Sequence, residues 1–349
     1  MANVGKRHLG KAFAISLQLR VLQYNNFMKK FRVLSDLHLD VNEKFPLELQ
    51  DKEIFTVICG DTAGITKMGI DWIRKNVKSG ICVSGNHLPY NDLMQSIQEQ
   101  RDNLAKEFPI DAPMSYFDVE CNAFFKEVDG ILFIGTCMYS DMRISAQWNA
   151  DGDFLVNCNK ALRTMNDYHH GIKSIEKDED GNVKRIERIT PKDYAAWFKH
   201  AYDEIEKKIS ENEASANPKS VVLITHFPVI KKLLDESYYV DPDNLASYGS
   251  DHEKWIHAHP SIKCYCSGHA HSVSKDFRNY YIERADGTKC LVVSNTRGYV
   301  YSGHDYFFNP NTFVDTETWT IQVEPESAEE IKRKEKQNAK YLALAPFFM

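Results

Sequence analysis

Histidine, aspartate and asparagine residues recur in this chain directly after short apolar runs. The five places are Asp36-Leu37-His38, Gly60-Asp61, Gly85-Asn86-His87, Thr225-His226 and Gly268-His269-Ala270-His271. Carboxylates, imidazoles and, less commonly, amide oxygens bind divalent metal ions. Each place alone has a simpler explanation, such as a turn, a helix cap or a buried structural histidine. Together they supply seven ligands besides His87, which suits two ions about 3.5–4 Å apart if one carboxylate is shared.

Seven apolar runs predict the buried strands that position these residues. The runs are Phe31–Ser35, Ile54–Cys59, Ile81–Ser84, Ile131–Thr136, Val221–Thr225, Ile262–Ser267 and Leu291–Ser294. Between them, Asn91–Phe108 and Thr190–Asn212 have the apolar spacing of helices, and Thr190 followed by Pro191 is a typical helix start. Strands that alternate with helices indicate an α/β domain, in which ligands bind at the carboxyl ends of the strands.

The remaining segments extend this domain. Residues 174–189 contain a charged turn between alternating segments, which predicts an exposed inserted hairpin. We expect one domain over residues 28–324, followed by a charged helix and tail over residues 325–349. Residues 1–27 are basic and end just before Met28, so we expect a disordered or mis-started extension there. An organelle transit peptide is the alternative.

Composition excludes several classes of protein. The 349 residues are 43% hydrophobic, which is enough for a large core. No apolar run approaches about 18 residues, so we expect no transmembrane helix and no membrane partner. A net charge of -6 disfavours a broad nucleic-acid surface. Eight scattered cysteines indicate reduced thiols and a cytoplasmic location.

One further histidine pair has the spacing of metal ligands. His257 and His259 follow no strand or glycine, so we expect them on the surface.

In their order along the chain, the five places resemble the motifs of the calcineurin-like metallophosphoesterase family. Those motifs read D-x-H, G-D, G-N-H followed by Asp or Glu, H, and G-H-x-H, and the resemblance covers about residues 31–300. It implies a four-layered αββα sandwich, an α/β fold with two mixed β-sheets. Leu88 departs from the pattern, because the family has an acid there that orients the preceding histidine. Asp40 and Asp141 are two candidates to replace that acid.

The resemblance also implies a role for each residue. The first ion would be held by Asp36, His38 and His271, the second by Asn86, His226 and His269, and both by Asp61. His87 would contact the phosphoryl group and assist the leaving oxygen. The cofactors would be two divalent or transition-metal ions (Mn, Fe, Zn or Mg), which supply a bridging hydroxide that attacks phosphorus.

We therefore expect a hydrolase of a phosphate ester, either a phosphodiesterase or a phosphomonoesterase. The alternative is a catalytically idle protein-binding scaffold of the same fold, like the retromer subunit. A scaffold tolerates the loss of ligands, whereas this set is complete. Substrate contacts are expected from Asp167 and His169, between the third and fourth places, and from Arg297, whose planar guanidinium suits a phosphate. A salt bridge or a role in a turn is the alternative for Arg297. His304 is a further candidate for a position near the site.

Overall fold

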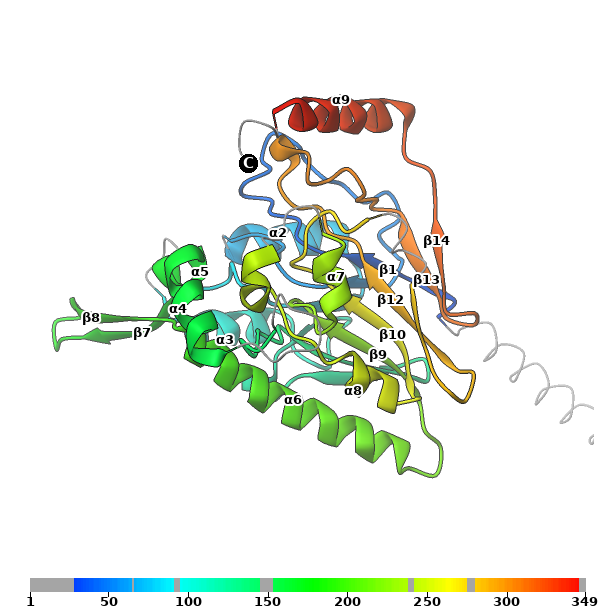
Figure 1. Ribbon diagram of the computed structural model, residues 1–349, viewed down its shortest axis with the longest axis horizontal. Helices are drawn as coiled ribbons and strands as arrows, with labels where there is room; N and C mark the ends of the chain where they lie inside the picture. Colours follow the sequence, from blue (N-terminus) through cyan, green and yellow to red (C-terminus); the bar gives the residue numbers. More distant parts are fainter. Residues whose placement is uncertain are drawn as a thin grey trace, which may run out of the picture.

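Two six-stranded sheets form the centre of the molecule (Figure 1). The computed structural model describes residues 28–64, 66–90, 95–144, 153–237, 242–274 and 280–344. The first sheet contains β1 (Lys30–Leu34), β2 (Thr56–Ile58), β3 (Gly80–Val83), β4 (Met114–Phe117), β13 (Thr312–Asp315) and β14 (Thr320–Val323). The second contains β5 (Phe125–Val128), β6 (Ile131–Thr136), β9 (Ser220–Thr225), β10 (Ile262–Ser267), β11 (Tyr281–Glu283) and β12 (Lys289–Ser294).

Both sheets are mixed. In the first sheet, whose order is β14-β13-β1-β2-β3-β4, strands β1 to β4 run parallel and β13 and β14 add an antiparallel edge. In the second, whose order is β11-β12-β10-β9-β6-β5, the four central strands run parallel and β11 and β5 are antiparallel edges. The carboxyl ends of the parallel strands within each sheet therefore lie at one edge.

Helices cover the outer faces of the two sheets, with α2 (Thr66–Asn76) and α3 (Ile97–Glu107) on the first and α6 (Pro191–Glu213), α7 (Lys231–Asp235) and α8 (Glu253–Ala258) on the second. The described residues also form α4 (Phe154–Thr164), α5 (Asn166–His170) and α9 (Ala328–Leu344), with short 3-10 turns at Val119–Cys121, Pro242–Ser247 and Val300–Ser302. Alternate residues of a strand face opposite sides of a sheet. In β9, for example, Val222 and Ile224 pack between the sheets, whereas Val221 and Leu223 pack with Ile205 of α6.

The same alternation holds in the first sheet. Val57 of β2 faces the space between the sheets, and Ile58 packs against Ile73 of α2. The layers are thus helix, sheet, sheet, helix. The predicted αββα sandwich with two mixed sheets is confirmed.

Most predicted elements are present with small shifts at their ends. Helix α6 begins at Pro191 after the capping residue Thr190, as predicted. The expected hairpin is formed by β7 (Ile172–Lys177) and β8 (Val183–Arg188), which project from the sandwich (Figure 1). The predicted helix start at Asn91 lies outside the described residues. In the described part of that segment, α3 begins at Ile97, where Ser96 and Glu99 form a capping box.

The domain boundaries remain predictions, and the expected extension over residues 1–27 lies outside the described residues. Strand β14 ends at Val323, and the charged helix α9 follows it. No helix in the described ranges is long and apolar enough to cross a membrane. All eight cysteines are free thiols.

The expectation that His259 lies on the surface is wrong. Its ring is buried after the end of α8, where Nε2 lies 2.8 Å from Glu206 Oε2 and Nδ1 lies 3.0 Å from Glu213 Oε2. Both glutamates belong to α6, which packs beside α8, so this histidine links two helices. His257 is exposed, as expected.

Candidate metal centre

The five polar places meet at the carboxyl ends of β1, β2, β3, β9 and β10. Backbone hydrogen bonds join the segments that follow these strands, such as those from Asp36 N to Gly60 O (3.1 Å) and from Gly268 N to His226 O (3.0 Å). A cavity of about 240 Å³ opens beside them. The predicted site residues that line it are His38, Asp61, Asn86, His87, His269 and His271.

One group of atoms gathers around Asp36. Its Oδ1 lies 3.1 Å from His271 Nε2, which in turn lies 3.2 Å from His38 Nε2. Two ligands about 2.1 Å from one ion, at angles between tetrahedral and octahedral, are about 3.0–3.4 Å apart. His271 thus has ligand spacing to both neighbours, whereas His38 Nε2 and Asp36 Oδ1 are 3.8 Å apart. The three side chains are among the sets that could hold one ion.

A second group gathers around His226. Its Nε2 lies 3.0 Å from Asn86 Oδ1 and 3.3 Å from Asp61 Oδ2, again within ligand spacing. The other ring nitrogen, Nδ1, lies 2.8 Å from the carbonyl oxygen of Cys59. A proton on Nδ1 satisfies that carbonyl, which leaves the lone pair of Nε2 pointing at the site.

Asp61 is shared between the two groups. It forms one candidate ligand set with Asp36 and His226 and another with His38 and His87. Its Oδ1 accepts a hydrogen bond from the backbone of His87 (3.1 Å), which leaves Oδ2 for the site. This position is the one expected of a bridging carboxylate.

Three buried atoms of the predicted ligands have no hydrogen-bond partner among the described residues. They are His38 Nδ1, Asp61 Oδ2 and His269 Nε2. Buried polar atoms are nearly always paired, because leaving one unpaired costs about 1–3 kcal/mol. Asp61 Oδ2 and, with the ring proton on Nδ1, His269 Nε2 can each donate an electron pair to a metal ion, and both residues line the same cavity. The donor set therefore fits bound metal ions.

The charges of the site are suited to cation binding. Burial alone would raise the pKa of Asp36, but the imidazoles of His226 and His271 outweigh it and lower that pKa. Burial and the nearby charge of His226 lower the pKa of His269 to about 3, so its ring is neutral. Burial opposes protonation of His226, but Asp61 and Asp36 raise its pKa to about 9. Without an ion, a proton on His226 thus partly neutralises the two carboxylates.

Backbone strain also concentrates at the site. Asp36, His38, Asp61 and His269 all have left-handed conformations, with φ of 52°, 43°, 46° and 63°. Such conformations are unfavourable for residues with a Cβ and cluster at functional sites. Gly60, with φ of 94°, lies so close to His226 that a Cβ there would be 2.7 Å from its Cγ. Only glycine fits both the turn and the close approach.

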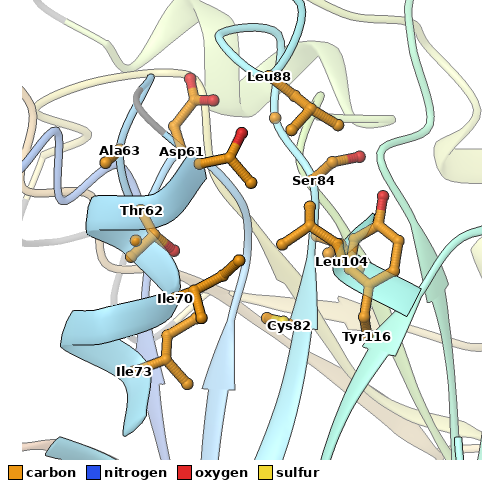
Figure 2. A pocket seen from close by; sticks show the side chains of 14 residues that line it. Asp61, Thr62, Ala63, Ile70, Ile73, Cys82, Ser84, Leu88, Leu104 and Tyr116 are labelled. Carbon is orange, nitrogen blue, oxygen red and sulfur yellow. The ribbon is translucent and has the colours of Figure 1, made fainter. Parts of the chain in front are cut away.

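His87 lies at the cavity, and the nearest carboxylate oxygen to its ring in the described residues, Asp61 Oδ2, is 3.9 Å from Nε2. Its Nε2 is 3.4 Å from the hydroxyl of Tyr299, and its ring packs on Tyr90 with centroids 4.7 Å apart. Figure 2 shows Leu88 bordering a small, largely apolar cavity of about 40 Å³, next to Asp61. Among the described residues, no carboxylate forms a hydrogen bond with the His87 ring.

Neither candidate replacement for the missing acid takes that place. Asp40 accepts a hydrogen bond from Gly64 N (3.1 Å). Asp141 lies 3.0 Å from His252 Nε2 and accepts from the backbone of Arg143. The ring of His87 is instead in contact with Tyr299, Tyr90 and His38, and the His38 ring centroid lies 4.7 Å away.

Of the three residues predicted to contact substrate, only Asp167 lines the cavity. Asp167 lines the cavity but is buried behind Asn86, whose Nδ2 donates to it. His169 is exposed and does not line the cavity. Arg297 is buried outside the cavity lining, and its guanidinium donates to the carbonyl of Phe45. His304 does line the cavity, where its Nδ1 lies 2.9 Å from His271 Nδ1.

Three tyrosines in the cavity wall were not predicted. Tyr90, Tyr248 and Tyr299 line it together with Met165 and Asn166. Tyr90 stands three residues after His87, and Tyr299 follows a strand whose end faces the site, so position relative to the motifs is the only sequence signal they carry.

Comparisons with known proteins inform the fold. No family model and no curated protein matches this sequence. Among solved structures, the chain is similar to the crystal structure of phosphopantetheinyl hydrolase (PptH) from Mycobacterium tuberculosis, with a TM-score of 0.51 and 16% sequence identity. The match covers 77% of this chain and 89% of that chain. At this identity the likeness establishes a shared fold, and the family that the motifs indicate remains a prediction.

Proposed function

We propose that this chain is a metal-dependent hydrolase of phosphate esters, of the calcineurin-like metallophosphoesterase type. The observation that carries the proposal is the convergence of two ligand groups on Asp61, whose buried Oδ2 lacks a hydrogen-bond partner in the described part of the chain. The shared fold with a protein described as a phosphopantetheinyl hydrolase supports the same general reaction.

The ligand assignment follows the two groups. Asp36, His38 and His271 would hold one ion, Asn86, His226 and His269 the other, and Asp61 both. When bound, such ions lower the pKa of water to near neutrality and stabilise negative charge on phosphoryl oxygens. The chain supplies the donor atoms, hydrogen bonds behind them that orient His226 and Asn86, and a cavity whose lining includes three tyrosines.

His87 is the residue proposed to act on the leaving group. It reaches the cavity, and its Nε2 lies 3.9 Å from Asp61 Oδ2. An imidazole that lines the cavity beside the proposed ligands could donate a proton to the departing oxygen of a bound ester, which contributes about 10²–10⁴-fold to a rate. The hydroxyl of Tyr299 holds the ring toward the ligands.

The test is hydrolysis by metal-stripped and metal-restored protein. We expect turnover of bis-p-nitrophenyl phosphate or p-nitrophenyl phosphate to disappear with chelation and return with Mn²⁺. A phosphopantetheinyl ester belongs in the same panel because of the structural neighbour. His87→Ala should lower kcat about 10²–10⁴-fold. His257→Ala, which removes an exposed histidine, is the matched control.

Less than one metal ion per chain, together with no turnover under added Mn²⁺, would overturn the proposal. Full metal binding without turnover of any of these esters would instead favour the protein-binding scaffold. The ratio of diester to monoester turnover assigns the subclass.

A further inference from the structure

Asp167 is a buried carboxylate that joins the metal centre to the wall of the cavity. It lies in α5, is 2% exposed, and is 81 positions along the chain from Asn86. Three side chains donate hydrogen bonds to it. Oδ1 accepts from Asn86 Nδ2 (3.0 Å) and from the hydroxyl of Tyr90, and Oδ2 accepts from the hydroxyl of Tyr194 (3.1 Å).

The bond to Asn86 determines which way its amide points. An ionised carboxylate can only accept hydrogen bonds, so it selects the orientation in which Nδ2 faces Asp167. The amide oxygen then faces the opposite side, 3.0 Å from His226 Nε2. The reversed amide would place two carbonyl-type acceptors together and turn an NH₂ group toward the ligands. An amide binds a metal through its oxygen, so the reversed form is not a ligand.

Through its hydrogen bond to Tyr90, Asp167 also affects the position of the His87 ring. The Tyr90 ring packs on the His87 ring with centroids 4.7 Å apart and planes 33° apart. Its hydroxyl is held by Asp167, so the ring has a fixed position. Leu88 borders an apolar cavity and offers His87 no hydrogen bond, so this packing replaces part of the missing support.

We infer that Asp167 is a positioning residue: it fixes the Asn86 amide as a metal ligand and, through Tyr90, the ring of His87. This reading rests on the proposed function for the identity of the ligands. It differs from the substrate contact predicted for Asp167 from sequence, because all three hydrogen bonds of its carboxylate go to protein groups.

The test measures metal affinity rather than turnover alone. Asp167→Asn keeps the shape but allows the amide at 86 to reverse. We expect the affinity for one of two Co²⁺ or Mn²⁺ ions to fall about 10–100-fold while the other ion stays bound, since loss of a contact behind a ligand has that size. Equilibrium dialysis gives the affinities, and the visible spectrum of bound Co²⁺ shows which coordination changes.

An exchanged pair provides the rescue. In Asn86→Asp/Asp167→Asn, the amide at 167 donates to a carboxylate at 86, which has an oxygen in either orientation. We expect this double variant to recover most of the lost affinity. Asp193→Asn is the control, because Asp193 caps α6 and lies outside the cavity lining. It should lower the unfolding temperature without changing metal binding.

Tyr90→Phe tests the second half of the inference. The ring remains but loses its anchor, so we expect kcat to fall with KM and both metal affinities unchanged. Wild-type affinity for both ions in Asp167→Asn, or no rescue by the exchanged pair, would overturn the role at Asn86. An unchanged kcat in Tyr90→Phe would overturn the role at His87. The metal measurements decide the first point whether or not the wild type hydrolyses phosphate esters, so the two failures are distinguishable.

Discussion

Replacing Gly60 by alanine should disable the centre through one methyl group. Gly60 has a φ of 94°, and the added Cβ would lie 2.7 Å from His226 Cγ and 2.9 Å from the carbonyl oxygen of Ser84. Ordinary contacts at a Cβ begin at 3.4 Å, and His226 Nδ1 would lie even closer to the added atom than Cγ does, so the imidazole must retreat by more than about 0.7 Å. That shift acts directly on a ligand whose Nε2 lies 3.0 Å from Asn86 Oδ1.

We expect Gly60→Ala to lower both the folding stability and the activity of the protein, for different reasons. The left-handed backbone costs an alanine about 1–2 kcal/mol of folding stability. The displaced imidazole affects function, because a misplacement of about 1 Å in a reacting constellation can cost about 100-fold in rate. We therefore expect Gly60→Ala to lose metal at the His226 side and about 100-fold in kcat/KM.

Gly181→Ala separates the two costs. Gly181 has a φ of 83° at the tip of the β7–β8 hairpin, and nothing lies within 4 Å of its added Cβ. It should lose similar stability in a denaturant titration but keep wild-type metal content and turnover. If Gly60→Ala bound two ions and hydrolysed substrate like Gly181→Ala, the close approach to His226 would have no functional meaning, and the placement of the centre would be wrong.

Three further predictions concern binding and stability. His226 has a pKa of about 9 without an ion, so at pH 7 it must release a proton before it can bind a metal ion. The metal affinity should therefore rise with pH up to about 9. Calorimetry that shows no proton release on metal binding at pH 7 would contradict this. Chelation should lower the unfolding temperature, since ligand at 100 times its Kd adds about 2.7 kcal/mol; equal temperatures with and without chelator would argue against a bound ion. Ile205 is 0% exposed, so Ile205→Ala should lower the free energy of unfolding by about 2–5 kcal/mol. Ile331 is 44% exposed, so Ile331→Ala should change it by less than about 0.5 kcal/mol. Similar denaturant midpoints for the two variants would contradict the core assignment.

The strands that carry the site were predictable because they are buried on both faces. β6 and β10 match the expected apolar runs at both ends. β14 was not predicted, because three of its four residues are polar or exposed and its sequence has no apolar run. β4 was missed because Ser115 interrupts a short buried segment.

The convergence of the motif residues was predictable from their places after the strands. Asp36, His38, Asp61, His226 and His271 belong to sets that could hold a metal ion, and their roles as ligands remain predictions. The contacts behind the ligands were not predictable, because Asp167 reaches Asn86 only through the packing of α5. The burial of His259 was missed for the same reason, since its two partner glutamates lie on another helix.

Anomalous X-ray scattering from crystals grown with Mn²⁺ would show whether Asp61 holds two ions. We expect two peaks about 3.5–4 Å apart on either side of the Asp61 carboxylate. One peak should lie near Asp36 and His271, and the other near Asn86 and His226. In Asp61→Ala, at least one peak should be lost. No peak at these residues, or two peaks that remain unchanged in Asp61→Ala, would contradict a centre in which Asp61 holds both ions.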